Sequence, residues 1–254
     1  MIADLLPASL QHRCANCDAL LVAEQRFCGV CGQRAPSKRL TLHDLLHDLT
    51  HAFLHFDSSA LALLRGLLVR PGRVAREYVD GHRKRYFGPF AFFVIIVGAS
   101  ALIISATDYL AQTADGSNNL IKAFLQRHVN ILILLQVPIL SGFCALMFRR
   151  DKLHFAEHSV LVAYASGFRS LIFSFVAIPI WYFTTPRVNS IYVTLPYLFV
   201  WFVYFGFAAS QFYAGSRAWT WLKGTLAAIL TQATTIGLVT VCVMIYMKYF
   251  PMSK

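Results

Sequence analysis

Four cysteines near the start of the chain are spaced as the ligands of one metal ion. Cys14 and Cys17 form one CxxC pair, and Cys28 and Cys31 form a second pair ten residues later. Two intervening residues let both thiolates of a pair face the same ion, and two pairs complete a closed tetrahedral shell. The spacing therefore predicts a structural zinc site, and zinc is the cofactor that we expect.

Other uses of these cysteines are less consistent with the sequence. A disulfide or a redox-active CxxC needs an oxidising compartment or a thioredoxin-like βαβ context, and neither is visible in the sequence. Gly29 and Gly32 are expected to allow the tight turns of a short zinc ribbon. Cys144 and Cys242 each lie alone in an apolar run and are predicted to be packing residues.

A run of histidines could supply a second metal site. They recur every fourth residue, opposite a stripe of leucine and phenylalanine, at His43, His47, His51 and His55. Histidines at this spacing share one helical face and can bind a metal together. Two interpretations stay open: a metal or proton-transfer site, and a solvated polar face.

An HxxEH pattern lies at the start of a later apolar segment. It consists of His154, Glu157 and His158, and on a helix it would place both imidazoles on one face beside the carboxylate. The pattern matches the inverted zinc-protease signature. Such an enzyme needs a further ligand, and no Asp or Glu follows Glu157, so that ligand would have to come from the earlier histidines. The alternative is an interfacial cap of polar residues.

Arg169 is a charged residue within an apolar segment. A charge deep in the bilayer costs at least ~2.5 kcal/mol on insertion scales, so its guanidinium should face a cavity, a partner or a bound anion. We predict a polar cavity lined by Arg169, Gln136, Gln232 and Tyr164. A structural arginine that binds free carbonyl groups near a helix break is the alternative.

The composition of the chain indicates an integral membrane protein. Hydrophobic residues make up 57% of the chain and charged residues 14%, whereas an ordinary soluble domain is about 45–50% apolar. Mean hydropathy is +0.56. Five segments are long enough to cross a ~30 Å hydrocarbon core. They are residues 89–109, 129–148, 159–183, 191–213 and 224–247.

The predicted fold is all-α apart from the ribbon. Residues 1–36 form a zinc ribbon and linker, residues 37–88 form amphipathic helices at the membrane surface, and residues 89–254 form a five-helix transmembrane bundle. The amphipathic region should hold one helix from Thr41, a second from Asp57 to the Arg70-Pro71 break, and a third that ends at Gly81.

The distribution of basic residues predicts the orientation. Seventeen Lys and Arg residues would be cytoplasmic if the N-terminus is inside, against five on the other side. This bias favours a cytoplasmic N-terminus and an external C-terminus. The net charge of +11 is explained by anionic lipid headgroups. Nucleic acid is an unlikely partner, because residues 1–40 carry only five basic and three acidic side chains.

Three motifs in order resemble a known family. After the ribbon come a His-rich stretch ending in HFD, the segment LLVRPGRVAREYVDGHRKRYFGP, and HFAEHSVL. This order resembles a large bacterial family of multi-pass membrane proteins known only as a domain of unknown function. The resemblance implies an architecture and the bacterial inner membrane, and it implies no activity. Similar proteins tend to carry a further His after AEH, where this chain has Val162, Ala163 and Tyr164.

We therefore predict a membrane protein with a non-enzymatic role in assembly, sensing or the carriage of a small molecule. Its ribbon would bind a cytoplasmic protein partner. The alternative is a metal-dependent membrane enzyme centred on the two groups of histidines.

Overall fold

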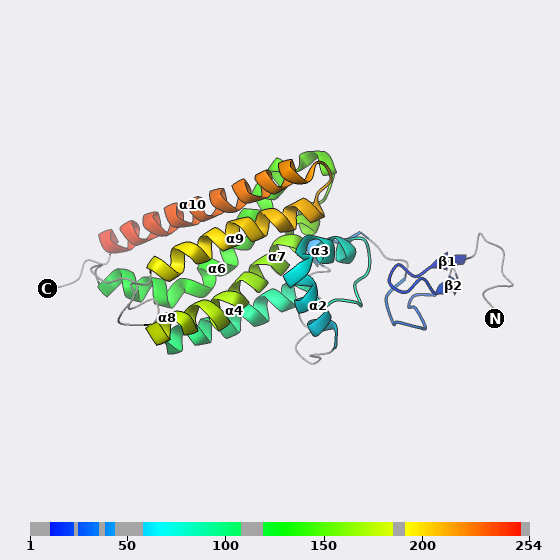
Figure 1. Ribbon diagram of the computed structural model, residues 1–254, viewed down its shortest axis with the longest axis horizontal. Coiled ribbons are helices and arrows are strands. Elements are labelled where there is room, and N and C mark those ends of the chain that lie inside the picture. Colours follow the sequence, from blue (N-terminus) through cyan, green and yellow to red (C-terminus); the bar gives the residue numbers. More distant parts are fainter. Residues whose placement is uncertain are drawn as a thin grey trace.

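The computed structural model describes residues 11–22, 25–35, 39–43, 58–107, 119–184 and 191–249. A small ribbon, residues 11–35, lies beyond one end of a long helical bundle (Figure 1). The two parts differ in how they are held together. The bundle has a large apolar core, whereas the buried apolar residues of the ribbon are Cys14, Leu21, Cys28 and Ala35.

The ribbon consists of two short hairpins with the same plan. Strand β1 (Gln11–Arg13) pairs antiparallel with β2 (Leu20–Val22), with Arg13 opposite Leu20. An isolated antiparallel bridge then joins Phe27 to Arg34. Each bridged pair encloses one CxxC, so the second hairpin repeats the first with an offset of fourteen positions.

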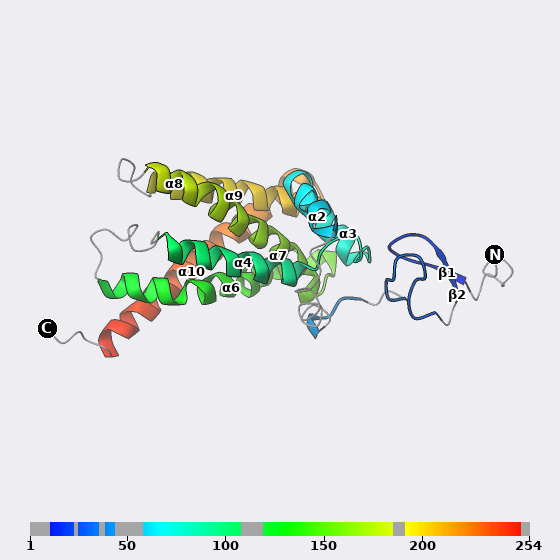
Figure 2. The same ribbon diagram turned by 90° about the horizontal axis from the view of Figure 1, so that it is seen from below.

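Helices α2 (Ser58–Val69) and α3 (Pro71–Val79) lie across the end of the bundle that is nearer the ribbon (Figure 2). Proline suits the first position of a helix because its fixed φ is helical and its missing N–H is not needed there. The break predicted at Arg70-Pro71 is therefore confirmed. The buried face of α3 includes Val74, Ala75 and Tyr78.

The bundle consists mainly of long helices that run between its two ends (Figures 1 and 2). They are α4 (Pro89–Ala106), α6 (Asn119–Met147), α7 (Phe155–Ile172), the π-helical turn η4 (Phe173–Ala177), α8 (Ile178–Thr184), α9 (Ile191–Phe212) and α10 (Arg217–Tyr249). Helices α7, η4 and α8 form one continuous helical path. The last described turn of α10 lies at the end of the bundle opposite the ribbon.

Four helical segments of the described chain are long and apolar enough to span a membrane. They are Pro89–Ala106, Phe155–Phe183, Tyr192–Phe212 and Arg217–Tyr246. The fifth predicted span falls in α6, where Ile133–Met147 is a shorter apolar stretch. The structure thus supports a helical membrane protein, and the count of five crossings stays a prediction.

Helix α7 is the central element of the bundle. Its side chains from Val160 to Ala165 are at most 1% exposed. Close approach to α4 requires a glycine in α7, because a methyl group at Gly167 would lie 2.8 Å from the ring of Phe92. Helices α9 and α10 pack through small residues in the way typical of membrane helices. The small residues at this contact include Gly206 and Ala209 of α9 and Gly224 of α10.

Candidate metal centre

The four predicted zinc ligands converge in the ribbon. Their Sγ atoms all lie within 4.8 Å of one another. Cys14 Sγ is 3.6 Å from Cys31 Sγ, and Cys17 Sγ is 3.5 Å from Cys28 Sγ. A disulfide would need about 2.05 Å. Four sulfurs at 2.3 Å from a tetrahedral zinc ion would lie about 3.8 Å apart, so the arrangement fits a closed four-thiolate site.

The backbone of the two CxxC turns explains this convergence. In the first turn Cys14 N–H donates to Ala19 O and Asp18 N–H donates to Cys14 O, both at 2.9 Å. In the second, Cys28 N–H donates to Gln33 O and Gly32 N–H donates to Cys28 O, both at 2.8 Å.

The residue after each second cysteine has a left-handed conformation. Asp18 has φ 57° and Gly32 has φ 69°. The turn role predicted for Gly32 is therefore seen. Gly29, in contrast, is not one of the described residues with positive φ, so the tight turn does not depend on it.

Backbone hydrogen bonds lower the pKa of the cysteine thiols, whereas burial raises it. The backbone N–H groups of Cys31 and Val30 lower the pKa of Cys28 to about 6, which favours its thiolate at neutral pH. The N–H of Ala19 also favours the thiolate of Cys17, yet burial and the neighbouring cysteines raise the pKa of Cys17 to about 12. A cation at the centre would stabilise all four thiolates together.

Gln33 connects the metal centre to the bundle. It follows the second CxxC turn directly, and it is 5% exposed. Its Nε2 donates to Gly81 O at 2.7 Å, and its Oε1 accepts from the N–H groups of Arg83 at 3.1 Å and Lys84 at 3.3 Å. These bonds join the ribbon to the turn that follows α3. Sequence reasoning missed this role, because a lone glutamine gives no signal.

The residues of the HxxEH pattern do not lie as predicted. His154 precedes the helix as its N-cap, with ψ 158°, and it is exposed, whereas His158 is buried within α7. The two imidazoles therefore do not share a helical face. Glu157 Oε2 accepts from His154 N–H at 2.7 Å, which caps the helix.

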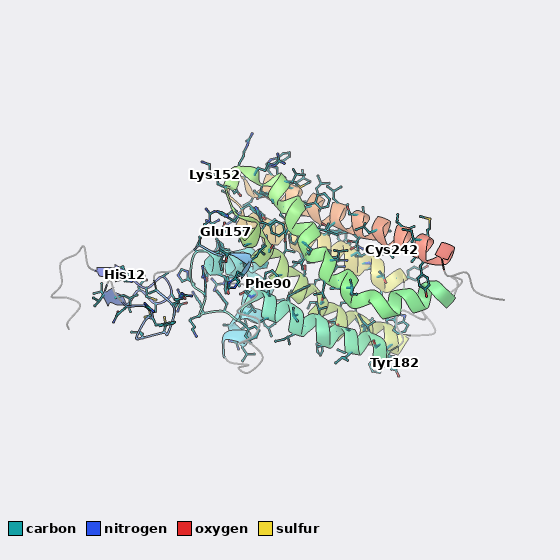
Figure 3. All side chains as sticks on the ribbon, turned by 180° about the vertical axis from the view of Figure 1, so that it is seen from behind. His12, Phe90, Lys152, Glu157, Tyr182 and Cys242 are labelled. Carbon is teal, nitrogen blue, oxygen red and sulfur yellow. The ribbon has the colours of Figure 1, made fainter. Side chains whose placement is uncertain are left out.

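Glu157 also binds an arginine from far away in the chain. Arg39 Nε donates to Glu157 Oε1 at 2.8 Å, and an Arg39 Nη donates to Oε2 at 3.0 Å. The same arginine reaches the Lys152 carbonyl at 2.8 Å. Lys152 and Glu157 lie at the ribbon end of the bundle (Figure 3). Both carboxylate oxygens are thus engaged by protein donors.

His158 has a buried partner as well. It is 1% exposed, and its Nδ1 lies 2.7 Å from the hydroxyl of Tyr213. The Tyr213 ring stacks on Phe148 with centroids 3.6 Å apart. These contacts give His158 a packing role at the ribbon end of the bundle.

No second metal centre is visible in the described part of the chain. Within it, the four cysteines are the one group of three or more ligand side chains that comes together. His43 lies in the described stretch 39–43. His47, His51 and His55 lie outside the described residues, so the predicted joining of the two histidine groups stays untested.

Arg169 is bound by neutral side chains of other helices. Its Nε donates to the Tyr197 hydroxyl at 3.1 Å, and an Nη donates to Gln136 Oε1 at 3.0 Å. Its guanidinium carbon lies 4.8 Å from the ring centre of Trp201. The structure thus brings Gln136 into contact with Arg169, while the predicted polar cavity stays a prediction. Tyr164 instead donates to Phe87 O at 2.6 Å, and Gln232 is half-buried on α10.

A further polar cluster surrounds Glu77 on α3. Its two oxygens accept from Tyr86 Oη at 2.6 Å, from Arg70 at 3.1 Å and from Arg85 at 3.4 Å. Burial and the hydrogen bond to Glu77 raise the pKa of Tyr86. The cluster fixes the chain on both sides of the turn that Gln33 binds.

Comparison with known proteins gives a partial match to a family of unknown function and indicates no activity. A family model described as "Protein of unknown function (DUF3667)" matches residues 63–100. This stretch contains the whole of the segment from Pro71 to Pro89 on which the resemblance to an uncharacterised family mainly rests. Comparisons with curated proteins and with solved structures gave no match.

Proposed function

We propose that this chain is a membrane protein whose ribbon holds one structural zinc ion and docks onto the membrane bundle. Its role is non-enzymatic and lies in assembly, in sensing or in the carriage of a small molecule. The observation that carries the proposal is the position of Gln33. Its backbone carbonyl accepts from the metal-ligating Cys28, and its side chain binds the turn at 81–84. The state of the metal centre is thereby linked to the bundle.

The ligand set supports zinc in a structural role. Four thiolates fill all the positions of a tetrahedral shell, so none is left open for water or substrate. Thiolates persist where the compartment is reducing. A ribbon on the cytoplasmic side of a bacterial inner membrane meets that condition, and the excess of basic residues on that side favours the same orientation.

The outer surface of the ribbon supports a protein partner. Phe27 is 62% exposed and Val30 is 77% exposed. Large apolar side chains that remain on the surface of so small a module suit contact with another protein. We propose that these exposed side chains bind a cytoplasmic partner, while Gln33, which is buried, binds the bundle.

The alternative, a metal-dependent membrane enzyme, receives less support from the described residues. Both oxygens of Glu157 are engaged by Arg39 and by His154 N–H, and His158 Nδ1 is engaged by Tyr213. A metal there would have to displace these contacts. Metal stoichiometry separates the two proposals: one tightly bound zinc per chain supports the structural role, and a second, chelator-sensitive metal supports the enzyme.

Limited trypsin digestion tests the link between metal and bundle. The turn bound by Gln33 contains Arg83 and Lys84, and trypsin cleaves after both types of residue. We expect the turn to be protected in zinc-loaded protein and cleaved after chelation. Gln33→Ala should expose the turn while still holding one zinc ion.

Gln25→Ala is the matched control, because Gln25 is a ribbon glutamine whose side chain binds Val22 N–H and no described residue outside the ribbon. It should retain both zinc and protection. Equal cleavage in wild type, chelated protein and Gln33→Ala would contradict the proposed link.

A further inference from the structure

A cavity of about 520 Å³ lies between α2 and α3 on one side and the corner between α9 and α10 on the other. It opens to the outside. The residues that matter to its chemistry are Arg70, Arg73, Phe207, Gln211, Arg217 and Trp221. It is separate from the metal centre and from the Arg169 contacts.

Three elements bring the arginines to this cavity. Arg70 occupies the break between α2 and α3, Arg73 lies in the first turn of α3, and Arg217 begins α10. Helix α3 is held against the end of α9, because Gly72 N–H donates to Gln211 Oε1 at 3.1 Å. The cavity wall is thus a fixed part of the fold.

The cavity is positively charged. No acidic side chain lines it. Arg70 is paired with Glu77 at 3.1 Å. Arg73 and Arg217 are exposed, and their guanidinium groups form no hydrogen bond or ion pair with any other described residue. Two guanidinium groups that line one cavity can form bidentate hydrogen bonds with the oxygens of a phosphate group.

The residues around the cavity suit a bound lipid better than a soluble anion. Phe207 and Trp221 form an apolar side of the hollow, and Trp is enriched where protein meets the headgroup level. From Phe207 an exposed apolar stripe continues along α9. It includes Val203, Val200 and Phe199, with exposed fractions from 38% to 68%. Helix α9 is one of the four apolar segments long enough to span a membrane.

We propose that this cavity binds the phosphate headgroup of an anionic phospholipid from the leaflet on the ribbon side. Arg73 and Arg217 contact the phosphate oxygens, and an acyl chain lies along the exposed stripe of α9. The bound lipid joins α3 to the start of α10. This role is independent of zinc, so it can fail while the proposed function stands.

Native mass spectrometry of the purified full chain, incubated with phosphatidylglycerol, tests the proposal. Arg73→Gln/Arg217→Gln should weaken binding of phosphatidylglycerol by roughly 30-fold, since each basic residue near an anionic surface contributes about fivefold. Arg149→Gln/Arg150→Gln is the matched control. It removes two exposed arginines close to the same end of the bundle, outside the cavity, and it should retain the lipid.

Ser210→Trp separates a cavity from general surface charge. Ser210 lines the cavity, so an indole there fills the hollow without changing any charge, and lipid binding should be lost. Circular dichroism and thermal unfolding report whether each variant remains folded.

Four outcomes would overturn the proposal. The first is an equal loss of phosphatidylglycerol binding in the two double variants, and the second is undiminished binding of this lipid by Ser210→Trp. The third is binding of phosphatidylcholine as tight as that of phosphatidylglycerol. The fourth is inorganic phosphate that competes for the site as strongly as phosphatidylglycerol does. The last would identify a site for free phosphate rather than for lipid.

Discussion

Arg39 binds both carboxylate oxygens of Glu157, although 118 positions separate the two residues. The exposure of the partners is unequal, because the Arg39 side chain is 53% exposed and that of Glu157 is 5% exposed. Their contact holds the chain that leaves the ribbon against the first turn of α7. Leu40, 3% exposed, then packs into the core of the bundle.

The unequal exposure predicts an order of stability. Arg39→Gln leaves the Glu157 carboxylate buried without its charged partner, which is costly. Glu157→Gln leaves Arg39 free to be solvated, and glutamine can still cap the helix. We therefore expect the temperature of unfolding in detergent to fall more for Arg39→Gln than for Glu157→Gln.

Asp80→Asn is a control for loss of charge at an exposed pair. Asp80 pairs with Arg76 one helical turn away, and the side chains of both are more than 40% exposed. Such pairs contribute little to stability, so this variant should unfold as the wild type does. If Glu157→Gln is the less stable of the first two variants, the interpretation of the buried carboxylate is wrong.

Loss of one ribbon cysteine should release the metal. In Cys28→Ser the shell of four thiolates is incomplete, and we expect zinc content to fall by about one ion per chain. Cys242→Ser is the control, because Cys242 is an exposed residue of α10 far from the ribbon (Figure 3). Elemental analysis of the purified proteins measures the difference. An unchanged zinc content in Cys28→Ser would exclude the four-cysteine site.

Gly72 is predicted to be irreplaceable for the packing of α3. A methyl group there would overlap the carbonyl oxygen of Ala208 and lie 2.9 Å from the backbone nitrogen of Phe212. Backbone atoms cannot move aside as side chains do, so Gly72→Ala should lower the free energy of unfolding by about 1–3 kcal/mol.

Gly98 gives the matched substitution. It lies within α4, and a methyl group there would meet nothing within 4 Å. Gly98→Ala should be neutral or stabilising by up to about 1 kcal/mol, because alanine favours the helix. Thermal unfolding of the two alanine variants in the same detergent compares them, and equal stability would contradict the close packing of α3 on α9.

The contacts of Arg169 predict coupling between two helices. Arg169→Leu leaves Gln136 Oε1 without its donor, and we expect a loss of about 1–3 kcal/mol. Gln136→Leu removes the other partner of the same bond. The double variant should therefore lose less than the sum of the single variants. Chemical or thermal unfolding of the four proteins measures the coupling, and additive losses would show that the bond contributes nothing.

The proposed orientation can be tested with reporter fusions. With five crossings and a cytoplasmic ribbon, a reporter fused after Lys254 should be active only as a periplasmic fusion. A reporter inserted at Gly215, between α9 and α10, should be active as a cytoplasmic fusion. Cytoplasmic activity at both positions would mean that α10 does not cross the membrane.

Local patterns in the sequence predicted the parts of the structure that depend on local spacing. The CxxC spacing predicted the convergence of Cys14, Cys17, Cys28 and Cys31, because each turn is formed within six residues. The break at Arg70-Pro71 was predicted for the same reason, since proline fixes its own backbone.

Contacts between distant segments could not be predicted in this way. Arg39 lies 118 positions from Glu157, and the turn bound by Gln33 lies about 50 positions from it, so nothing in the neighbouring sequence indicates these contacts. The HxxEH pattern misled because a helix that begins at Phe155 leaves His154 outside it. Of the residues predicted to line a cavity with Arg169, Gln136 binds it directly, while the cavity itself stays a prediction. The contact with Tyr197 was missed, because a tyrosine in an aromatic-rich segment gives no signal of its partner.

If the ribbon binds zinc as proposed, the position of Gln33 makes zinc binding and docking of the ribbon two linked equilibria. If the side chain binds the 81–84 turn only when the second CxxC turn is formed, docking must tighten zinc binding by the same factor by which zinc tightens docking. A net contribution of about 1 kcal/mol from such hydrogen bonds corresponds to roughly a fivefold change in the zinc dissociation constant. Any ligand or partner that separates the turn from Gln33 would therefore lower the affinity of the four cysteines for zinc. Binding events at the membrane surface would in this way change the zinc affinity of the ribbon.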